Sequence, residues 1–284
     1  MAFYAYDEEE CPIHASLAVK GERYYCMECF LPVKARNRRA LSSHFYHTRT
    51  SPKCRLYSKT EDHLLAQLQL EKLVPPGAIQ LERPFLDISR IADACWEEKK
   101  IVFEIQCSQL EIPEATARIK DYASQGYRVV WLLHDRLFNR KATRPVELFL
   151  RQGLAYYIHI ERGLTSLYYD QFEVLAHGKR LKKGKKLPID LQAPHFLAKL
   201  EWKDFFPKQV LDRVASDPFY FKGDRLNKAL IAHYSPGAAM SMEHWRILEV
   251  DLGRRPKRPG RLRGWFLLYI GYPYMRMLAQ LGAK

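Results

Sequence analysis

The stretch Arg90-Ile-Ala-Asp-Ala-Cys-Trp-Glu-Glu-Lys-Lys-Ile-Val-Phe-Glu-Ile-Gln-Cys-Ser108 decides the fold that we expect. Two apolar runs, 90–96 and 101–108, flank a polar turn, and this pattern predicts a β-hairpin. Side chains alternate between the two faces of a strand, so the second run presents one apolar face and one face that carries Glu104. The first run carries Asp93. The hairpin therefore brings two carboxylates towards each other.

Each of these carboxylates interrupts an apolar run, and burying a charge without compensation is costly. A bound cation would compensate both, and Mg²⁺ or Mn²⁺ suits Asp93 and Glu104 because hard divalent ions prefer oxygen ligands. Such an ion polarises a phosphoryl oxygen and orients a water for attack. Gln106 projects from the same face as Glu104. A structural ion pair would explain the buried acids equally well, so both interpretations stay open.

The residues before the hairpin predict a helix and a first strand. Ser58-Lys-Thr-Glu61 has the pattern of a capping box, and Pro75-Pro-Gly77 ends the helix. Residues 79–83 read as a strand. The apolar positions at helical spacing are Leu64, Leu65, Leu68 and Leu73.

After the hairpin, Pro113 opens a second helix that extends to about Gln125, and residues 127–134 form an apolar run of strand length. A strand, a helix and a strand in this order predict a parallel βαβ unit. The complete order is α, β, β, β, α, β. We divide the chain into a Cys/His-rich region 1–57, an α/β region 58–135 and a basic region 136–284 of mixed or mainly helical structure.

The charge of the chain favours a polyanionic partner. Its 46 Lys and Arg residues exceed its 32 Asp and Glu residues, which gives a formal net charge of +14 and a sequence pI near 9.5. DNA and an anionic membrane surface both fit this charge. The third region holds two basic runs, 179–186 and 254–263. From them we select Lys182, Lys183, Arg254, Arg255 and Arg258 as candidate DNA contacts.

The first region carries cysteine and histidine pairs at the spacing of a small structural zinc site. They are Cys26-Met-Glu-Cys29 and His44-Phe-Tyr-His47, followed by Cys54, so five candidates compete for four positions. Cys11-Pro-Ile-His14 together with Cys26 and Cys29 is an alternative set. Clustered cysteines, no visible secretory signal and no apolar run of membrane-spanning length together predict a cytoplasmic protein.

Three motifs together resemble the CoiA competence-protein family: Arg90-Ile-Ala-Asp-Ala94, Val102-Phe-Glu-Ile-Gln-Cys-Ser108 and Arg118-Ile-Lys-Asp-Tyr-Ala-Ser-Gln-Gly-Tyr-Arg-Val-Val-Trp131. The resemblance covers about 24–134. It implies an α/β fold with a PD-(D/E)XK nuclease-like core (αβββαβ) behind a zinc-ribbon-like module. It also implies action on DNA taken up during natural transformation, and it favours the downstream zinc set.

The resemblance assigns roles within the core. It implies that Asp93 and Glu104 are metal ligands, and that Gln106 occupies the position where most nucleases of this superfamily have a lysine. Glu61 or Asp62 would supply a third acid from the first helix. The helical stripe of leucines favours Glu61, whose alternative role is in the capping box.

Arg118 and Tyr122 lie one helical turn apart, where related nucleases line the path of the DNA, so Arg118 is a candidate phosphate contact. We expect a metal-dependent DNA nuclease that acts on incoming DNA during transformation and recombination. The alternative is a non-catalytic DNA-binding accessory protein with a degenerate nuclease core. The expected partners are DNA, single-stranded or a recombination intermediate, and a recombinase.

Overall fold

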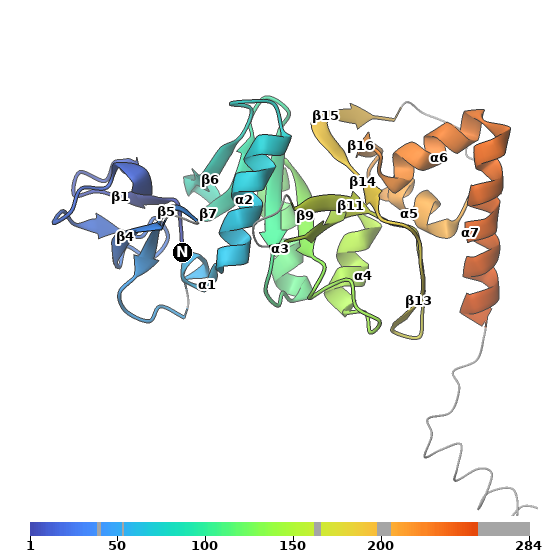
Figure 1. Ribbon diagram of the computed structural model, residues 1–284, viewed down its shortest axis with the longest axis horizontal. Helices are drawn as coiled ribbons and strands as arrows, with labels where there is room; N and C mark the ends of the chain where they lie inside the picture. Colours follow the sequence, from blue (N-terminus) through green and yellow to red (C-terminus); the bar gives the residue numbers. More distant parts are fainter. Residues whose placement is uncertain (39–40, 53, 162–165, 198–205, 255–284) are drawn as a thin grey trace, which may run out of the picture.

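The computed structural model describes residues 1–284 except 39–40, 53, 162–165, 198–205 and 255–284. A small β-module at the N-terminus, a central α/β body and a C-terminal part of strands and helices follow one another along the longest axis (Figure 1). The candidate residues of the core lie in the central body, beside the N-terminal module.

The N-terminal module is a five-stranded sheet in the order β2-β1-β3-β4-β5. A small core packs against it, in which Ala5 and Phe45 are fully buried. Met27 and Leu56 extend this core towards the segment that leads into the central body. The elements are β1 (Tyr4–Tyr6), β2 (Pro12–His14), the 3₁₀ helix η1 (Ala15–Leu17), β3 (Tyr24–Tyr25), β4 (Pro32–Arg38) and β5 (Leu41–His47).

The central body is built on a seven-stranded sheet in the order β14-β11-β10-β9-β8-β7-β6. Its first elements follow the predicted order α, β, β, β, α, β. Short helical segments α1 (Arg55–Ser58) and η2 (Leu86–Ile88) accompany them. The six elements in that order are α2 (Glu61–Leu73), β6 (Gln80–Phe85), β7 (Arg90–Trp96), β8 (Ile101–Gln106), α3 (Ile112–Ser124) and β9 (Arg128–His134).

The start of α2 differs from the sequence prediction. Ser58 belongs to the short helix α1, where its hydroxyl donates to the carbonyl of Arg55 (2.8 Å). The N-cap of α2 is instead Thr60, whose backbone is extended and whose hydroxyl accepts from the amide of His63 (3.4 Å). The capping box predicted at Ser58 was therefore wrong by two residues, because a separate helical turn takes up Ser58.

The predicted hairpin and βαβ unit are confirmed. β7 and β8 are antiparallel, with Ala94 opposite Phe103, whereas β8 and β9 are parallel and joined by α3. The predicted alternation along β8 is confirmed as well: Phe103 packs into the core on one face of the sheet and Val102 into the core on the other. One step beyond the pair Ala94–Phe103, this register sets Asp93 beside Glu104.

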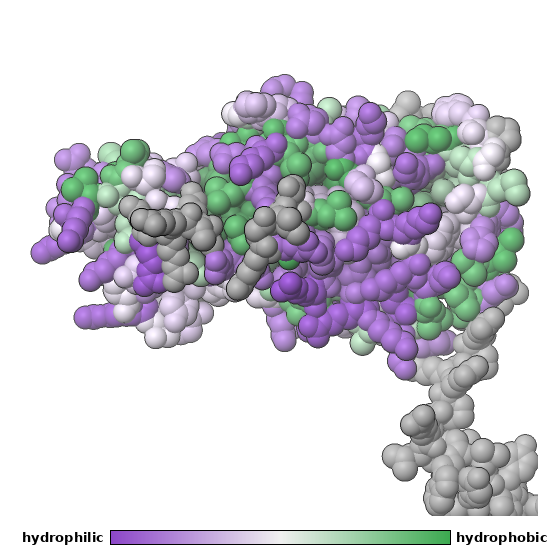
Figure 2. All heavy atoms as spheres, viewed as in Figure 1, coloured by the Kyte–Doolittle hydropathy of each residue, from purple (hydrophilic) through white to green (hydrophobic). Residues whose placement is uncertain are grey.

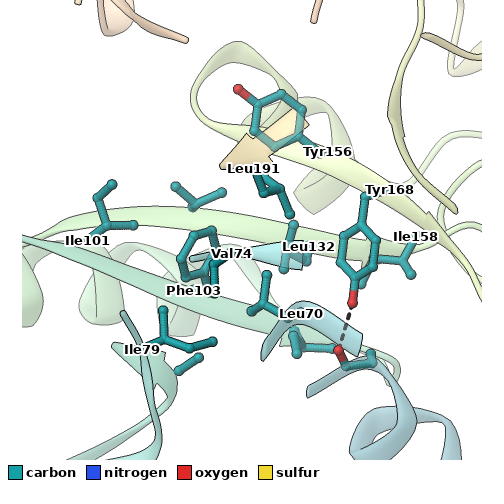
Figure 3. Packing of buried hydrophobic residues seen from close by; sticks show 14 of the residues in the cluster. Leu70, Val74, Ile79, Ile101, Phe103, Leu132, Tyr156, Ile158, Tyr168 and Leu191 are labelled. Carbon is teal, nitrogen blue, oxygen red and sulfur yellow. Dashed lines mark hydrogen bonds between the residues drawn. The ribbon is translucent and has the colours of Figure 1, made fainter. Parts of the chain in front are cut away.

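One hydrophobic core packs against each face of the seven-stranded sheet. The core beneath α2 contains Leu70, Phe103 and Leu132, and the Tyr168 hydroxyl donates to the carbonyl of Ala66 in α2 (2.6 Å) (Figure 3). The opposite core lies beneath α3 and α4 (Pro145–Gln152). Because both faces are covered by helices, the strands read as nearly continuous apolar runs.

The sheet continues past residue 135, where we placed a boundary. The strand β10 (Ala155–His159) runs parallel to β9, and β11 (Leu167–Asp170) and β14 (Leu187–Pro188) extend that edge. The boundary falls inside the sheet because the apolar strand β10 completes the same two cores. A β-hairpin of β12 (Glu173–Ala176) and β13 (Lys179–Lys183) projects beside it.

The C-terminal part is mixed, as the sequence predicted. A fourth, small hydrophobic core contains Phe206 and Leu226. The paired strands β15 and β16 lead from the central body into three helices (Figure 1). The elements are β15 (Asp190–Phe196), α5 (Lys208–Ser216), β16 (Phe219–Lys222), α6 (Arg225–Tyr234) and α7 (Pro236–Arg254).

Buried ion pairs fasten the C-terminal part to the sheet. Asp170, at the end of β11, accepts from Arg151 of α4 (2.7 Å) and pairs with Arg225 of α6 (3.0 Å). All three side chains are at most 4% exposed.

Hydrophilic side chains cover much of the visible face of the central body (Figure 2). Within the described residues, every helix is too short or too polar to cross a lipid bilayer.

The first prediction concerns the core beneath α2. Phe103 is fully buried there, and replacing a buried phenylalanine by alanine removes transfer free energy and leaves a cavity. We expect Phe103→Ala to lower the free energy of unfolding by about 3 to 5 kcal/mol, measured by urea denaturation followed by circular dichroism. Leu86→Ala is the control because Leu86 is 79% exposed. Equal losses in the two variants would contradict this packing.

The second prediction concerns Asp170. Burial alone would raise the pKa of this carboxyl, but the charges of Arg225 and Arg151 outweigh burial and lower it to about 2. Because the unfolded value is about 3.9, Asp170 stabilises the fold at neutral pH, and this contribution is lost as the pH falls through 4 towards 2.

Asp170→Asn lacks this titration. The difference in unfolding free energy between wild type and Asp170→Asn should therefore shrink by about 1 kcal/mol between pH 6 and pH 3 in urea titrations. Asp251→Asn serves as the control because Asp251 is exposed on α7. A difference that stays constant with pH would count against the ion pairs.

Candidate functional site

A cavity of about 570 Å³ lies between the N-terminal module and the central sheet. Residues of both the module and the central body line this cavity, so side chains that are distant in sequence meet there. Its lining includes the charged and polar residues Glu28, Arg55, Lys59, His63, Asp93, Glu104, Gln106 and Arg118.

Asp93 is 5% exposed and is surrounded by donors. Its Oδ1 accepts from the Lys59 ammonium (2.8 Å) and lies 3.0 Å from the Nε2 atom of His63. Its Oδ2 accepts from the backbone amide of Ile105 in β8 (2.8 Å), so the carboxylate reaches across to the neighbouring strand. Burial alone would raise the pKa of Asp93, but the charges of His63 and Lys59 outweigh burial and lower it. Asp93 is therefore an anion at neutral pH.

Lys59 is held between two carboxylates. Its ammonium also pairs with Glu82 (3.1 Å), and only 8% of its side chain is exposed. Burial would lower the pKa of Lys59, but the charges of Asp93 and Glu82 outweigh burial and raise it. Lys59 therefore stays protonated and acts as a fixed positive charge.

Glu82 faces this ammonium because of an unusual backbone. It lies in β6 with φ of 50°, between Leu81 opposite Ala94 and Arg83 opposite Ala92. Residues other than glycine rarely adopt this left-handed region, and they do so where surrounding contacts enforce it. Here, Glu82 Oε2 accepts from the amides of Phe3 (2.7 Å) and Tyr4 (3.1 Å) in the N-terminal module.

Glu104 is paired with side chains of α3. Its Oε2 accepts from Arg118 (2.7 Å) and its Oε1 from the Tyr122 hydroxyl (2.8 Å), both on α3. Burial raises the pKa of Glu104, and neighbouring Asp93 raises it further, against the opposing charge of Arg118. Arg118 also pairs with Glu114 (2.8 Å), so two carboxylates hold its guanidinium in place at the wall of the cavity.

The donor set of Asp93 and Glu104 fits a small divalent ion. The two carboxylates are neighbours across β7 and β8 and line the same cavity. Each carboxylate oxygen has two acceptor sites. Asp93 Oδ1 uses both, whereas Asp93 Oδ2 and the two oxygens of Glu104 each accept one hydrogen bond and keep a site for a further contact. Mg²⁺ commonly takes only one or two protein carboxylates and completes its octahedron with water and phosphate oxygens.

The other candidates in the core lie as follows. Gln106 lines the cavity, and its amide nitrogen donates to the carbonyl (2.9 Å) and hydroxyl (3.1 Å) of Ser108. Glu61 and Asp62 form the partly exposed first turn of α2 and are not among the residues that line the cavity. The side chain of this turn that reaches Asp93 is His63.

Sequence reasoning missed Lys59 and His63 as site residues. Lys59 lies within the predicted capping box, which suggests only a role in starting the helix. Little in the sequence indicates that these two residues belong to the site, because their partners lie far away along the chain. Asp93 lies 30 residues after His63, and only the fold brings them together.

Four predicted zinc ligands converge in the N-terminal module. The ligand atoms of Cys26, Cys29, His47 and Cys54 all lie within 4.8 Å of one another. The distances are 3.6 Å from Cys26 Sγ to Cys54 Sγ and 3.2 Å from Cys29 Sγ to His47 Nε2. Ligand atoms around a tetrahedral zinc ion lie roughly 3.5 to 3.8 Å apart, given its bond lengths to sulfur and nitrogen. The cluster could therefore hold zinc.

Two aspects of the cluster support metal binding. Burial lowers the pKa of His47, which favours the neutral imidazole that a metal requires. The amide of Glu28 points at Cys26 Sγ (3.5 Å), and the amide of Phe30 closes the turn onto the Cys26 carbonyl (2.9 Å). The turn thus presents two thiols on the same side.

The remaining zinc candidates are placed elsewhere. His44 is not part of the cluster because His44 and His47 are three residues apart on β5 and so face opposite sides. Among the described residues, Cys11 and His14 are not in the group whose ligand atoms converge with those of Cys26 and Cys29, so the alternative set does not assemble. Cys11 is exposed, and His14 contacts Ser16 (2.8 Å). The alternation of side chains along β5 therefore selects His47 and not His44 for the cluster.

Glu28 connects the cysteine cluster with the cavity. It lies between Cys26 and Cys29, and its Oε2 accepts from Cys54 Sγ (3.3 Å) and from the amide of Leu56 (3.0 Å). Its Oε1 accepts from Arg55 (2.5 Å). The segment that continues from Cys54 reaches Lys59 in the cavity, so the carboxylate of Glu28 fixes the start of the segment that carries this lysine.

Of the candidates in the two basic runs, Lys182 and Lys183 do not line the cavity. Lys182 and Lys183 are exposed on β13, and Lys183 donates to the carbonyl of Asn139 (2.6 Å). Arg254 ends α7, but its side chain is not described, and Arg255 and Arg258 lie outside the described residues.

Comparison with protein families gives one match. The family described as "Competence protein CoiA, nuclease-like domain" matches residues 59–209, just over half of the 284-residue chain. Curated proteins and solved structures gave no match. The matched range begins at Lys59 and contains the cavity residues Lys59, His63, Asp93, Glu104, Gln106 and Arg118. It does not include Glu28, Arg55 or the cysteine cluster.

The third prediction tests the cluster. We expect purified protein to carry about one zinc per chain, measured by mass spectrometry of the metal, since four ligands complete a structural site. Cys26→Ser and Cys54→Ser should each lose most of this zinc. Cys11→Ser is the matched control and should retain it because Cys11 is exposed and lies outside the cluster. Full zinc content in Cys54→Ser would contradict the assignment.

Proposed function

Because the chain belongs to the competence protein CoiA family, we propose that it is a deoxyribonuclease dependent on Mg²⁺ or Mn²⁺ that acts on incoming DNA during natural transformation and recombination. The observation that carries this proposal is the pair Asp93 and Glu104, adjacent across two strands inside one cavity. The order α2, β6, β7, β8, α3 and β9 supports a PD-(D/E)XK core around that pair.

Asp93 and Glu104 would hold the divalent ion, which supplies a Lewis acid for the phosphoryl oxygen and lowers the pKa of a bound water. Lys59 then supplies the positive charge that Gln106 lacks. Its ammonium lies 2.8 Å from Asp93 and remains protonated, so it stabilises negative charge that develops on the phosphate and does not act as a base. Gln106 keeps its carbonyl oxygen as an acceptor for water.

Two arginines support phosphate binding at the cavity. Arg118 fixes Glu104 and lines the cavity. Arg55 lines it from the side of the N-terminal module, with 33% of its side chain exposed. The DNA strand would therefore pass between the module and the sheet. Exposed Lys182 and Lys183 would add affinity that falls with salt because bound DNA releases counterions.

We further propose a cytoplasmic protein with structural zinc that works beside a recombinase on single-stranded DNA or recombination intermediates. The family and the cysteine cluster support this setting. The basic runs also allow contact with an anionic membrane, which liposome co-sedimentation would test.

A non-catalytic DNA-binding role is the second candidate, and a specific observation favours it. Asp93 is already paired with Lys59 and His63, and Glu104 with Arg118 and Tyr122. These internal contacts neutralise both acids without an ion. This candidate predicts salt-sensitive DNA binding with neither cleavage nor Mn²⁺ binding in the cavity.

The fourth prediction separates the two candidates. Wild-type protein with Mn²⁺ should cleave labelled DNA, and Asp93→Asn, Glu104→Gln and Lys59→Met should each lower the rate by about 10²- to 10³-fold. The first two remove a ligand of the ion, and the third removes the charge that stabilises the phosphate. Zinc content and circular dichroism would verify that each variant is folded. Calorimetric titration with Mn²⁺ should show a site that Asp93→Asn lacks.

Two controls sharpen this experiment. Glu98→Gln changes an exposed glutamate of the polar turn and should leave the rate unchanged. Glu61→Gln tests the helix acid: a rate like wild type would exclude Glu61 as a third catalytic acid. If wild type and Asp93→Asn cleave equally, the proposed site is wrong. Tight DNA binding without cleavage in wild type would favour the second candidate.

A further inference from the structure

A second hollow, of about 460 Å³, lies on the N-terminal module. It shares no lining residue with the cavity of the candidate site. Three aromatic and three acidic side chains line it: Tyr6, Tyr25, Phe30, Asp7, Glu8 and Glu10.

The aromatic wall is held by the fold. Tyr6 of β1 is directly opposite Tyr25 of β3, so the two side chains share a face of the sheet. Phe30 stacks on Tyr6 with a distance of 5.8 Å between ring centroids. Phe30 is nevertheless 60% exposed, because the turn at Cys26 and Cys29 projects it outwards. The module thus keeps a large aromatic ring in solvent with two tyrosines behind it.

The rest of the lining is acidic. Asp7, Glu8, Glu9 and Glu10 are consecutive, and no basic residue lines the hollow. Asp7 shapes this loop, since its Oδ1 accepts from the amides of Glu9 (3.0 Å) and Cys11 (2.8 Å). Arg23 lies 3.9 Å from Glu8, but both side chains are mostly exposed, so this pair neutralises little charge. A negative hollow is unexpected in a chain with net charge +14.

The chemistry of the hollow selects its ligand. DNA would be repelled by the acids. A metal ion is disfavoured because, within the described part of the chain, these acids are not among the groups whose ligand atoms converge. A cationic side chain fits instead, because aromatic faces attract cations and carboxylates pair with them. Arginine fits best, since its planar guanidinium stacks on rings and still donates to acids at its edge.

We infer that this hollow binds an arginine side chain presented by a basic segment of a partner protein. The inference does not depend on nuclease activity. It gives the module two distinct surfaces: one that forms a wall of the DNA cavity and one that contacts protein. A protein bound there would leave the cavity open.

Fluorescence anisotropy tests the inference with a labelled peptide, Gly-Arg-Gly-Arg-Gly-Arg-Gly, at low salt. A peptide with glutamate in place of arginine is the comparison. We expect wild type to bind the arginine peptide and not the glutamate peptide. Phe30→Ala should weaken binding by about three- to fivefold, and Glu8→Gln with Glu10→Gln by about tenfold or more.

Matched controls exist for both variants. Phe196→Ala also removes an aromatic ring that is 60% exposed, but one on β15, and should bind like wild type. Glu9→Gln with Glu98→Gln removes two exposed acids that do not line the hollow. Zinc content and circular dichroism would show that the module is folded in every variant.

Three results would overturn the inference. The first is equal affinity of wild type for the arginine and glutamate peptides. The second is unchanged arginine-peptide binding in both the Phe30 and the Glu8/Glu10 variants. The third is self-association in sedimentation velocity that these same variants abolish, because a second copy of the chain would then occupy the hollow in place of a partner protein.

Discussion

The structure depends on one buried ammonium. Lys59 lies between Asp93 and Glu82, and Glu82 in turn accepts from the amides of Phe3 and Tyr4. Four parts of the chain therefore meet at one charge: the N-terminal strand, the segment before α2, β6 and β7. An unpaired buried charge costs several kcal/mol, so no part can move away without exposing or isolating a charge. This constraint fixes how the module sits on the sheet.

The same constraint prepares the candidate site. Asp93 remains ionised because Lys59 and His63 surround it, whereas burial raises the pKa of Glu104 despite its contact with Arg118. The pKa values of the two neighbouring carboxylates thus shift in opposite directions, because Asp93 faces Lys59 and His63 at the start of α2 whereas Glu104 faces α3. Such internal cations stabilise the acids in the absence of an ion, and a phosphate with its metal would have to compete with them or use the remaining lone pairs.

Sequence predicted the parts of this arrangement that depend on local pattern. The alternation of apolar side chains identified the hairpin with Asp93 and Glu104, and Pro113 identified the helix that joins two parallel strands. It did not predict Lys59 as a partner of Asp93, because the two residues lie far apart in the sequence and only the packing of the segment before α2 against β7 brings them together. The boundary at 135 failed for a related reason, since strand β10 completes cores that begin earlier in the chain.

The N-terminal module is part of the candidate site and not a separate domain attached beside it. Glu28 lies between two cysteines of the cluster, yet its carboxylate holds Cys54, Arg55 and Leu56, which lead directly to Lys59. Glu28 and Arg55 also line the cavity itself. The family match starts at Lys59, so it contains this lysine and the acids that pair with it, but not Glu28 and the cysteine cluster, which hold the segment before it. Metal in the cluster would therefore act on the candidate site through geometry, by fixing the segment that delivers its positive charge.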